Sequence, residues 1–228
     1  MSEKLTLTPT DMSAVMLFDS NYINNKGAKL YAPGTYDQAV EYYRLAAAMG
    51  NVHAASNLGY CYLYGRSIEP NLSLALAYFR YAAAKRDVDA AYKLGDIFGS
   101  DKWGVKDVEM SAYHYRMAAS FILDEPWENP NVIAWNEELD HYPSLCYALG
   151  REMSPGGNMN TDLDSAYQFL RKAEMGYRRE LANGSEMYRE SFEGVLRLIQ
   201  NPQFDGVREK YDPIFDEEDP EGEETIAD

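Results

Sequence analysis

Residues 35–71 read TYDQAVEYYRLAAAMGNVHAASNLGYCYLYGRSIEPN, and this stretch returns along the chain at a fixed interval. An aromatic residue followed by arginine recurs every 36 positions, at Tyr43-Arg44, Phe79-Arg80 and Tyr115-Arg116. A fourth copy is centred on Arg171, 55 positions after Arg116, so the third copy carries 19 additional residues. A fixed period of this length is typical of stacked repeats, in which each unit buries its apolar face against its neighbours. The chain is therefore predicted to be an all-α solenoid.

Each copy is predicted to begin with a helix whose buried face is made of small residues around one aromatic ring. In the first copy this face holds Ala39, Tyr43, Ala46, Ala47 and Gly50, which share one side of a helix. Added volume in the alanine columns, for example at Ala47 or Ala83, is expected to destabilise the contact. The expected N-caps of the four helices are Thr35, Asn71, Asp107 and Asp162.

The second helix of the first copy is expected between His53 and Tyr64. Its inner side is predicted to hold Ala54, Leu58, Cys61 and Tyr62. Gly59 lies beside these residues and is interpreted as allowing a close contact with the preceding helix. Gly65 and Pro70 mark the end of the helix.

The motifs AVEYYRLAAAMGNVHAASNLGYCYLYG and SAYHYRMAAS, with YKLGDIFGSDKWGVKD between copies, resemble Sel-1-like repeats, which are related to tetratricopeptide repeats. The resemblance covers Thr35 to about Asp162 well and Leu163 to Gly176 in part. It implies a right-handed superhelix of helix pairs that serves as an adaptor or scaffold for other proteins. It implies no catalytic residue.

The predicted organisation has six segments. Residues 1–34 form a half repeat with a capping helix over Ser13 to Asn24, followed by repeats at 35–70 and 71–106, a repeat with the insertion at 107–161, and a degenerate repeat with a C-terminal capping helix at 162–201. Ser185 is expected to cap that last helix. The insertion is interpreted either as an extra helix that packs on the neighbouring turn and hides Trp127 and Trp135, or as a loop that contacts a partner.

The last segment, 202–228, is predicted to be an acidic, disordered tail. From Asp212 to Asp228 there are nine acidic residues and no basic ones. High charge, two prolines and no apolar period favour disorder. The alternative is that Tyr211, Ile214 and Phe215 form a short motif that docks on a partner or in this protein's own groove.

The net charge of −16 argues against nucleic acid and anionic membranes as partners, because both are polyanions. Two cysteines at non-equivalent repeat positions do not suggest a disulfide framework. The first residues show no signal peptide, and no stretch is apolar enough to span a membrane. These features predict a cytoplasmic protein. Its oligomeric state stays open, with a slight preference for a monomer.

The sequence contains no recognisable catalytic or metal-binding motif. None of the three histidines lies at metal-ligand spacing from another histidine or from a cysteine. We expect no metal and no cofactor, and predict a non-enzymatic adaptor that binds a protein or peptide. An immunity or inhibitor protein that neutralises a basic toxin is the first alternative, and an enzyme or enzyme subunit is the second.

The predicted binding surface is a stripe of aromatic and methionine side chains beside the buried face of the first helices. Its members are Tyr42, Leu45, Tyr78, Tyr81, His114 and Met117. If the first helices line the concave side of the solenoid, the stripe forms a continuous contact site. The alternative is that these side chains are shared with the partner helix and belong to the core. Trp127 and Trp135 of the insertion are the other candidates for partner contact.

Overall fold

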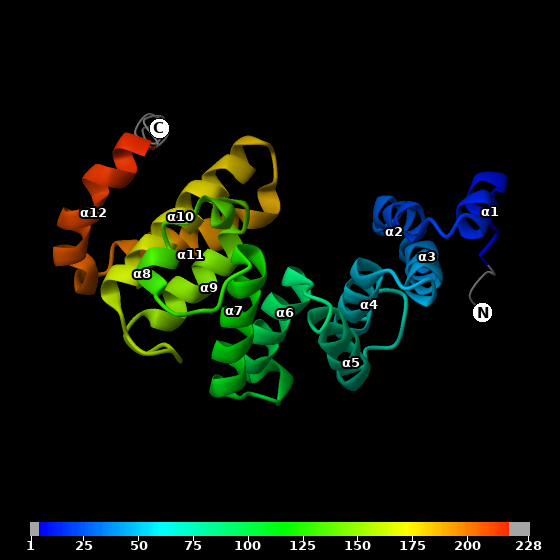
Figure 1. Ribbon diagram of the computed structural model, residues 1–228, viewed down its shortest axis with the longest axis horizontal. Coiled ribbons are helices and arrows are strands. Elements are labelled where there is room, and N and C mark those ends of the chain that lie inside the picture. Colours follow the sequence, from blue (N-terminus) through cyan, green and yellow to red (C-terminus); the bar gives the residue numbers. More distant parts are fainter. Residues whose placement is uncertain (1–4, 219–228) are drawn as a thin grey trace. The chain divides into compact units, whose positions relative to one another are not determined.

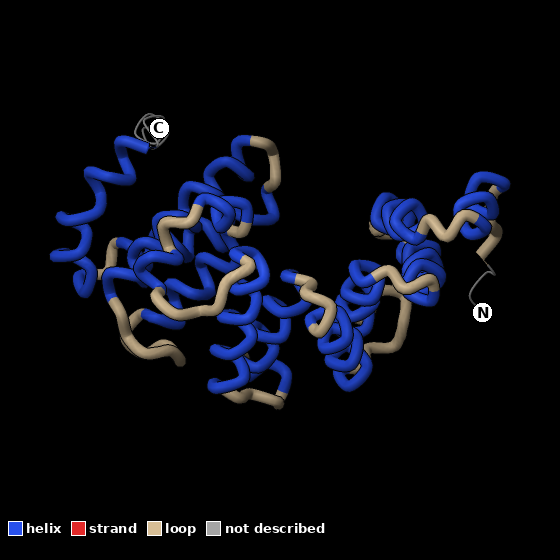
Figure 2. The backbone as a smooth tube through the Cα atoms, in the orientation of Figure 1, coloured by secondary structure: helices blue, strands red, loops and turns tan. Residues whose placement is uncertain are grey.

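The computed structural model describes residues 5–218, which form helices joined by short turns and contain no strand (Figures 1 and 2). The chain divides into two compact units, residues 1–106 and 107–228. The first unit contains α1 (Pro9–Met16), α2 (Ser20–Lys29), α3 (Tyr36–Ala48), α4 (Val52–Tyr64), α5 (Leu72–Ala83), α6 (Val88–Gly99) and η1 (Asp101–Trp103). The second contains α7 (Val108–Leu123), α8 (Pro130–Ile133), η2 (Glu137–His141), α9 (Pro143–Met153), α10 (Leu163–Ala182), η3 (Glu186–Tyr188), α11 (Arg189–Ile199), η4 (Pro202–Phe204) and α12 (Asp205–Glu218).

Consecutive helices pack against one another in both units, which gives the predicted all-α arrangement of helix pairs. In the first unit α2 lies against α3 and α4 against α5, and in the second α9 lies against α10. The alanine column that begins at Ala46 is fully buried in every copy, at Ala46, Ala82, Ala118 and Ala173. Ala83 of the neighbouring column is also buried, but Ala47 is only half-buried, because it borders a groove.

A glycine of one helix meets a buried side chain of the next. The pairs are Gly27 with Tyr43, Gly59 with Phe79 and Gly150 with Leu170. A Cβ atom at Gly59 would lie 2.7 Å from Cε1 of Phe79, closer than real Cβ contacts allow. Gly59 is on α4 and Phe79 on α5, so the predicted close contact is with the following helix and not with the preceding one.

Three of the four predicted N-caps are confirmed. Asn71, Asp107 and Asp162 each accept a hydrogen bond from the backbone N–H three residues later. Thr35 was expected to do the same, but its hydroxyl donates to the carbonyl of Leu30 at 2.7 Å. Asn51 and Asp87, which the repeat pattern also places 36 positions apart, cap α4 and α6.

The predicted N-terminal helix over Ser13 to Asn24 is wrong, because the chain turns between α1 and α2. Phe18 has a positive φ of 56°, and the Asp19 side chain caps α2 by accepting from the N–H of Tyr22. Thr8 and Asp11 form a reciprocal capping box at the start of α1. The local capping residues therefore make two helices where periodicity alone suggested one.

The insertion forms helical turns that pack on the second unit. Asn129 caps α8, and Ile133, Ala134 and Leu139 are buried. Trp127 stacks on Phe169 of α10 with ring centroids 6.0 Å apart. The insertion is therefore an added helix, but it does not hide both tryptophans, because Trp127 is half-buried and Trp135 is 36% exposed.

The C-terminal region differs from the prediction in two ways. Ser185 makes no side-chain cap, and α11 begins only at Arg189, after the turn η3. The predicted disorder from residue 202 is also wrong for residues 205–218, which form α12. Phe204, Tyr211 and Phe215 are spaced by seven and four residues and bury one face of this segment. The remainder of the predicted tail, 219–228, lies outside the described residues.

Candidate peptide-binding groove

An apolar groove of about 490 Å³ lies in the first unit, between α3, α4 and α5. Small side chains form its floor because the alanines at 47, 48, 55 and 77 leave space that larger residues would fill. Leu58 lies beneath them and is buried. The groove thus follows directly from the alanine-rich repeat.

Leu74, Tyr78 and Tyr81 of α5 form one wall of the groove. They lie four and seven residues apart, so they share one helix face. Leu74 and Tyr81 are 42% and 46% exposed. Tyr78 is half-buried, because its ring stacks on that of Tyr62 with centroids 5.6 Å apart and an interplanar angle of 10°. Two apolar side chains at the wall are therefore open to a ligand, while Tyr78 is fixed by packing.

Arg44 of α3 places a positive charge at the groove. Burial by itself would lower the pKa of its guanidinium, but a hydrogen bond with Tyr62 and the nearby Glu41 carboxylate raise the pKa. Glu41 also forms an ion pair with Arg44 on the same helix. The groove therefore combines an apolar surface with a guanidinium that is paired with Glu41 and is 43% exposed, so that its remaining N–H groups can donate to a ligand carboxylate.

Tyr42 and Leu45 do not belong to this groove, which corrects the predicted stripe. Tyr42 is buried, and its hydroxyl donates to Oδ2 of Asp11 at 2.9 Å. Leu45 packs against the core formed by α1 to α4. Tyr42 and Leu45 therefore belong to the core, as the alternative interpretation of the stripe proposed.

The other predicted residues lie in the second unit. His114 of α7 is buried, and Met117 on the same helix is half-buried. Trp127 packs on α10, as described above, and Trp135 stacks on Phe215 of α12 with centroids 5.1 Å apart. Of the predicted site residues, only Tyr78 and Tyr81 are brought together at the groove. Sequence reasoning missed Leu74 and Arg44, although Leu74 could have been found from its position one turn before Tyr78.

No three His, Cys, Asp or Glu side chains among the described residues are grouped so that they could hold a metal ion. None of the helices between residues 5 and 218 combines the length and the apolar character needed to cross a membrane.

The two cysteines are free and buried, and burial raises the pKa of the Cys61 thiol to about 11 and that of Cys146 to about 12. Because the thiolate is the reactive form, we expect neither thiol to react with a disulfide reagent such as Ellman's reagent within minutes at pH 8. Both should react at once in denaturant. Titration of a thiol in the native protein would contradict the burial seen here.

Comparisons with known proteins place the repeat in a family. The Sel1 repeat model matches residues 20–51, 52–87, 88–120 and 143–176, which together make up more than half of the chain. The first two matches contain the pairs α2–α3 and α4–α5, so the family's unit is shifted by one helix from the copies counted from Thr35. No curated protein gives a significant match to the chain.

The solved structures that are similar to this chain include two repeat proteins. The Sel1 repeat protein from Oxalobacter formigenes is 25% identical, with a TM-score of 0.44, over 67% of this chain and 95% of its own. A protective antigen present in uropathogenic Escherichia coli strains, which displays an SLR fold, is 19% identical with a TM-score of 0.46 over 78% of this chain. The similarity spans 43% of that antigen's length. The extent of the family match, together with the paired helices and their buried alanine columns, shows that the chain belongs to the Sel1 repeat family.

Proposed function

We propose that the protein is a non-enzymatic scaffold that binds a protein partner through a short peptide segment in the groove of the first unit. Sel1 repeat proteins are generally scaffolds for protein interactions, which supports a binding role at the level of the family. The observation that carries the proposal is the groove of about 490 Å³ with two large apolar side chains exposed along one wall. Exposed apolar surface of this kind usually marks a contact site.

The side chains that line the groove indicate which kind of peptide would bind there. Leu74 and Tyr81 offer apolar area for an aliphatic or aromatic anchor, and the alanine floor admits its side chain. Arg44 favours a carboxylate near that anchor. This combination fits a peptide with an apolar anchor and an acidic neighbour better than it fits a basic ligand.

Peptides selected from a displayed random library against the immobilised full chain should share such an anchor and an acidic residue close to it. The double variant Leu74→Ser and Tyr81→Ser should weaken their binding by about 30-fold, because truncating a central anchor typically costs about 2 kcal/mol. Both side chains are more than 40% exposed, so stability should change by less than about 0.5 kcal/mol for each. Fluorescence anisotropy and thermal unfolding measure the two effects.

Tyr113→Ser is the matched control, because Tyr113 is a 52% exposed tyrosine of the second unit and is absent from the groove. This variant should bind the selected peptides as the parent does. Equal loss of binding in the control, or undiminished binding in the double variant, would place the partner elsewhere. Tyr42 is left unchanged because it is part of the core.

A further inference from the structure

The C-terminal helix α12 lies on α10 in the second unit and is held there by aromatic side chains. The Phe204 ring, at the start of this segment, lies 5.5 Å from that of Tyr167. Trp135 of the insertion stacks on Phe215 at 5.1 Å with an interplanar angle of 13°. Tyr211 and Phe215, one helical turn apart, are thus inserted beside α10 and the insertion.

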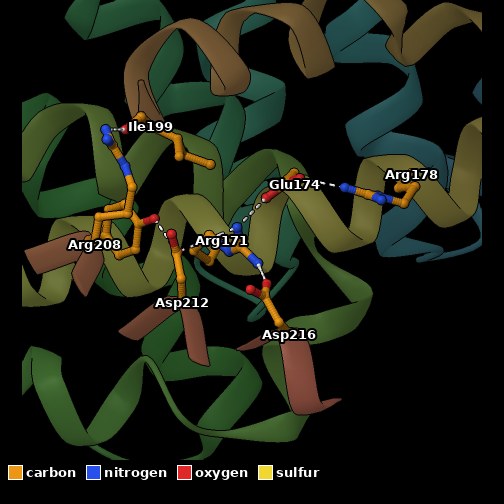
Figure 3. Close-up of polar contacts among 8 residues, drawn as sticks. Arg171, Glu174, Arg178, Ile199, Arg208, Asp212 and Asp216 are labelled. Atoms are coloured by element: carbon orange, nitrogen blue, oxygen red, sulfur yellow. Dashed lines mark hydrogen bonds and ion pairs between the residues drawn. The ribbon is translucent and has the colours of Figure 1, made fainter. Parts of the chain in front are cut away.

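A polar layer borders these rings and is centred on Arg171 of α10 (Figure 3). Arg171 contacts carboxylate oxygens of Asp216 at 2.7 Å and Asp212 at 3.5 Å on α12, and of Glu174 at 3.4 Å on its own helix. Its guanidinium also lies 5.5 Å from the centroid of the Phe215 ring. The Arg171 guanidinium therefore contacts two carboxylates and one aromatic ring of α12.

The N-terminal half of α10 completes the recognition of α12. Tyr167 donates its hydroxyl to Asp212, and the hydroxyl of Tyr211 donates to Asp164 at 2.8 Å. Lys210 forms an ion pair with the same Asp164. Asp164, Tyr167 and Arg171 occupy one face of α10 over two turns, and with Trp135 they make up what we call the α10 docking surface.

The docked helix carries a repeated pattern that matches this surface. Its sequence Lys210-Tyr211-Asp212 is followed four residues later by Phe215-Asp216. An aromatic residue and the aspartate after it thus occur twice at a spacing of one turn, so both rings face the interior and both carboxylates face Arg171. Amphipathic helices that bind grooves present their anchors at this spacing.

The rings of Phe204, Tyr211 and Phe215 are buried, but other features of α12 weaken its attachment to α10. Pro213 lies inside α12, where it cannot donate the hydrogen bond that would continue the helix. The Asp216 and Lys210 side chains that form ion pairs with α10 are 48% and 60% exposed, so salt screens these pairs in part. Among the described residues, the buried Nε of Arg171 has no hydrogen-bond partner, so α12 does not satisfy the cation completely.

We propose that the α10 docking surface is a binding site for an acidic amphipathic helix of a partner protein, and that α12 is its intramolecular competitor. The proposal extends the proposed scaffold function to a second surface, which is independent of the groove in the first unit. The partner helix carries a basic residue, an aromatic residue and an acidic residue in succession and, after two intervening residues, a second aromatic–acidic pair. Its carboxylates are recognised by Arg171 and its rings by Trp135 and the adjoining face of α10.

The test uses the full chain and a fluorescein-labelled synthetic peptide of residues 203–218. In the parent protein α12 competes, so the peptide should bind weakly. Phe215→Asp in the full chain should release α12 and strengthen peptide binding at least tenfold. Ile214→Asp is the matched control, because Ile214 is on the same helix but is exposed, and it should leave peptide binding as in the parent. Equal binding by parent and Phe215→Asp chains, or none by either, would overturn the proposal.

A charge exchange tests the contact itself, and its first two variants do not depend on the Phe215 variant staying folded. The full chain with Asp212→Lys and Asp216→Lys should also release α12 and bind the parent peptide at least tenfold more tightly. Adding Arg171→Glu to that chain should abolish binding of the parent peptide. In the full chain that carries Phe215→Asp and Arg171→Glu, a peptide with the two lysines should bind and the parent peptide should not. Failure of this exchange would exclude Arg171 as the recognising residue.

An alanine-based helical peptide tests the chemistry of the partner. It keeps only the residues of the pattern, which correspond to Lys210, Tyr211, Asp212, Phe215 and Asp216. It should compete with the labelled peptide for the Phe215→Asp chain, whereas a scrambled version should not. Light scattering after size-exclusion chromatography should give the same molecular mass for the parent and variant chains. A shift of the parent chain to a dimer that Phe215→Asp abolishes would show that the ligand is α12 of a second copy, which would overturn the assignment to a different partner.

Discussion

Replacing Asp11 by alanine is expected to lower the free energy of unfolding by about 4 kcal/mol. The Asp11 carboxylate is fully buried and accepts hydrogen bonds from Lys26 Nζ at 2.6 Å, the Tyr42 hydroxyl at 2.9 Å and the Thr8 N–H at 2.8 Å. Removing one partner of a buried ion pair typically costs about 3 to 5 kcal/mol. Here the buried Tyr42 hydroxyl would lose its acceptor, and Lys26, which is 27% exposed, would lose its counter-ion. Chemical denaturation of the two proteins measures the difference. Asp37→Ala, at an exposed carboxylate in the first turn of α3, should change stability by less than about 1 kcal/mol.

The same cluster predicts a dependence of stability on acid. Burial alone would raise the pKa of Asp11, but the hydrogen bonds from Lys26, Thr8 and Tyr42 outweigh it and hold the pKa well below its usual range. A carboxyl group whose pKa is depressed by folding stabilises the protein above its unfolded value, about 3.9, and this contribution is lost as the pH falls below that value. The parent should therefore lose stability more steeply below pH 4 than Asp11→Asn, which has no carboxylate there. Parallel curves for the two proteins would show that Asp11 does not contribute.

Replacing Gly59 by valine should cost about 3 kcal/mol and affect the first unit. Any Cβ at this position would lie within 2.9 Å of three ring atoms of Phe79, and that ring is fully buried between α4 and α5. Overpacking of a closed contact typically costs about 1 to 3 kcal/mol, and the branched side chain of valine brings the cost to the upper end. Thermal and denaturant unfolding would measure the loss.

Gly206 gives the matched comparison, because it is a helical glycine with no atom within 4 Å of its Cβ position. Gly206→Val should stay within about 0.5 kcal/mol of the parent, since valine is a modest helix former but meets no neighbour. A Gly59→Val protein as stable as the parent would show that Phe79 can move aside and that the glycine is not required for the approach of the helices.

The sequence alone determined the helix pairs and the columns that join them. The sequence predicts the 36-residue period, the alanine column from Ala46 and the caps at Asn71, Asp107 and Asp162. It does so because each feature depends on residues within one or two helical turns. The helix boundary near Phe18 was missed, although Thr8, Asp11 and Asp19 carried a local signal for it. The apolar spacing of Phe204, Tyr211 and Phe215 is also present in the sequence and is compatible with a helix. The acidic residues around it led to the prediction of disorder instead.

Only the tertiary structure decided which members of a repeated column are buried. Tyr42 and Tyr78 occupy the same position in successive copies, and the repeat pattern therefore treats them alike. Tyr42 is covered because Asp11 of α1 reaches its hydroxyl, whereas Tyr78 stacks on Tyr62 and lines an open groove. The two tyrosines differ in burial because different segments of the chain lie next to them. Periodicity within a helix specifies which residues share a face, but whether that face is buried depends on segments far away in the sequence.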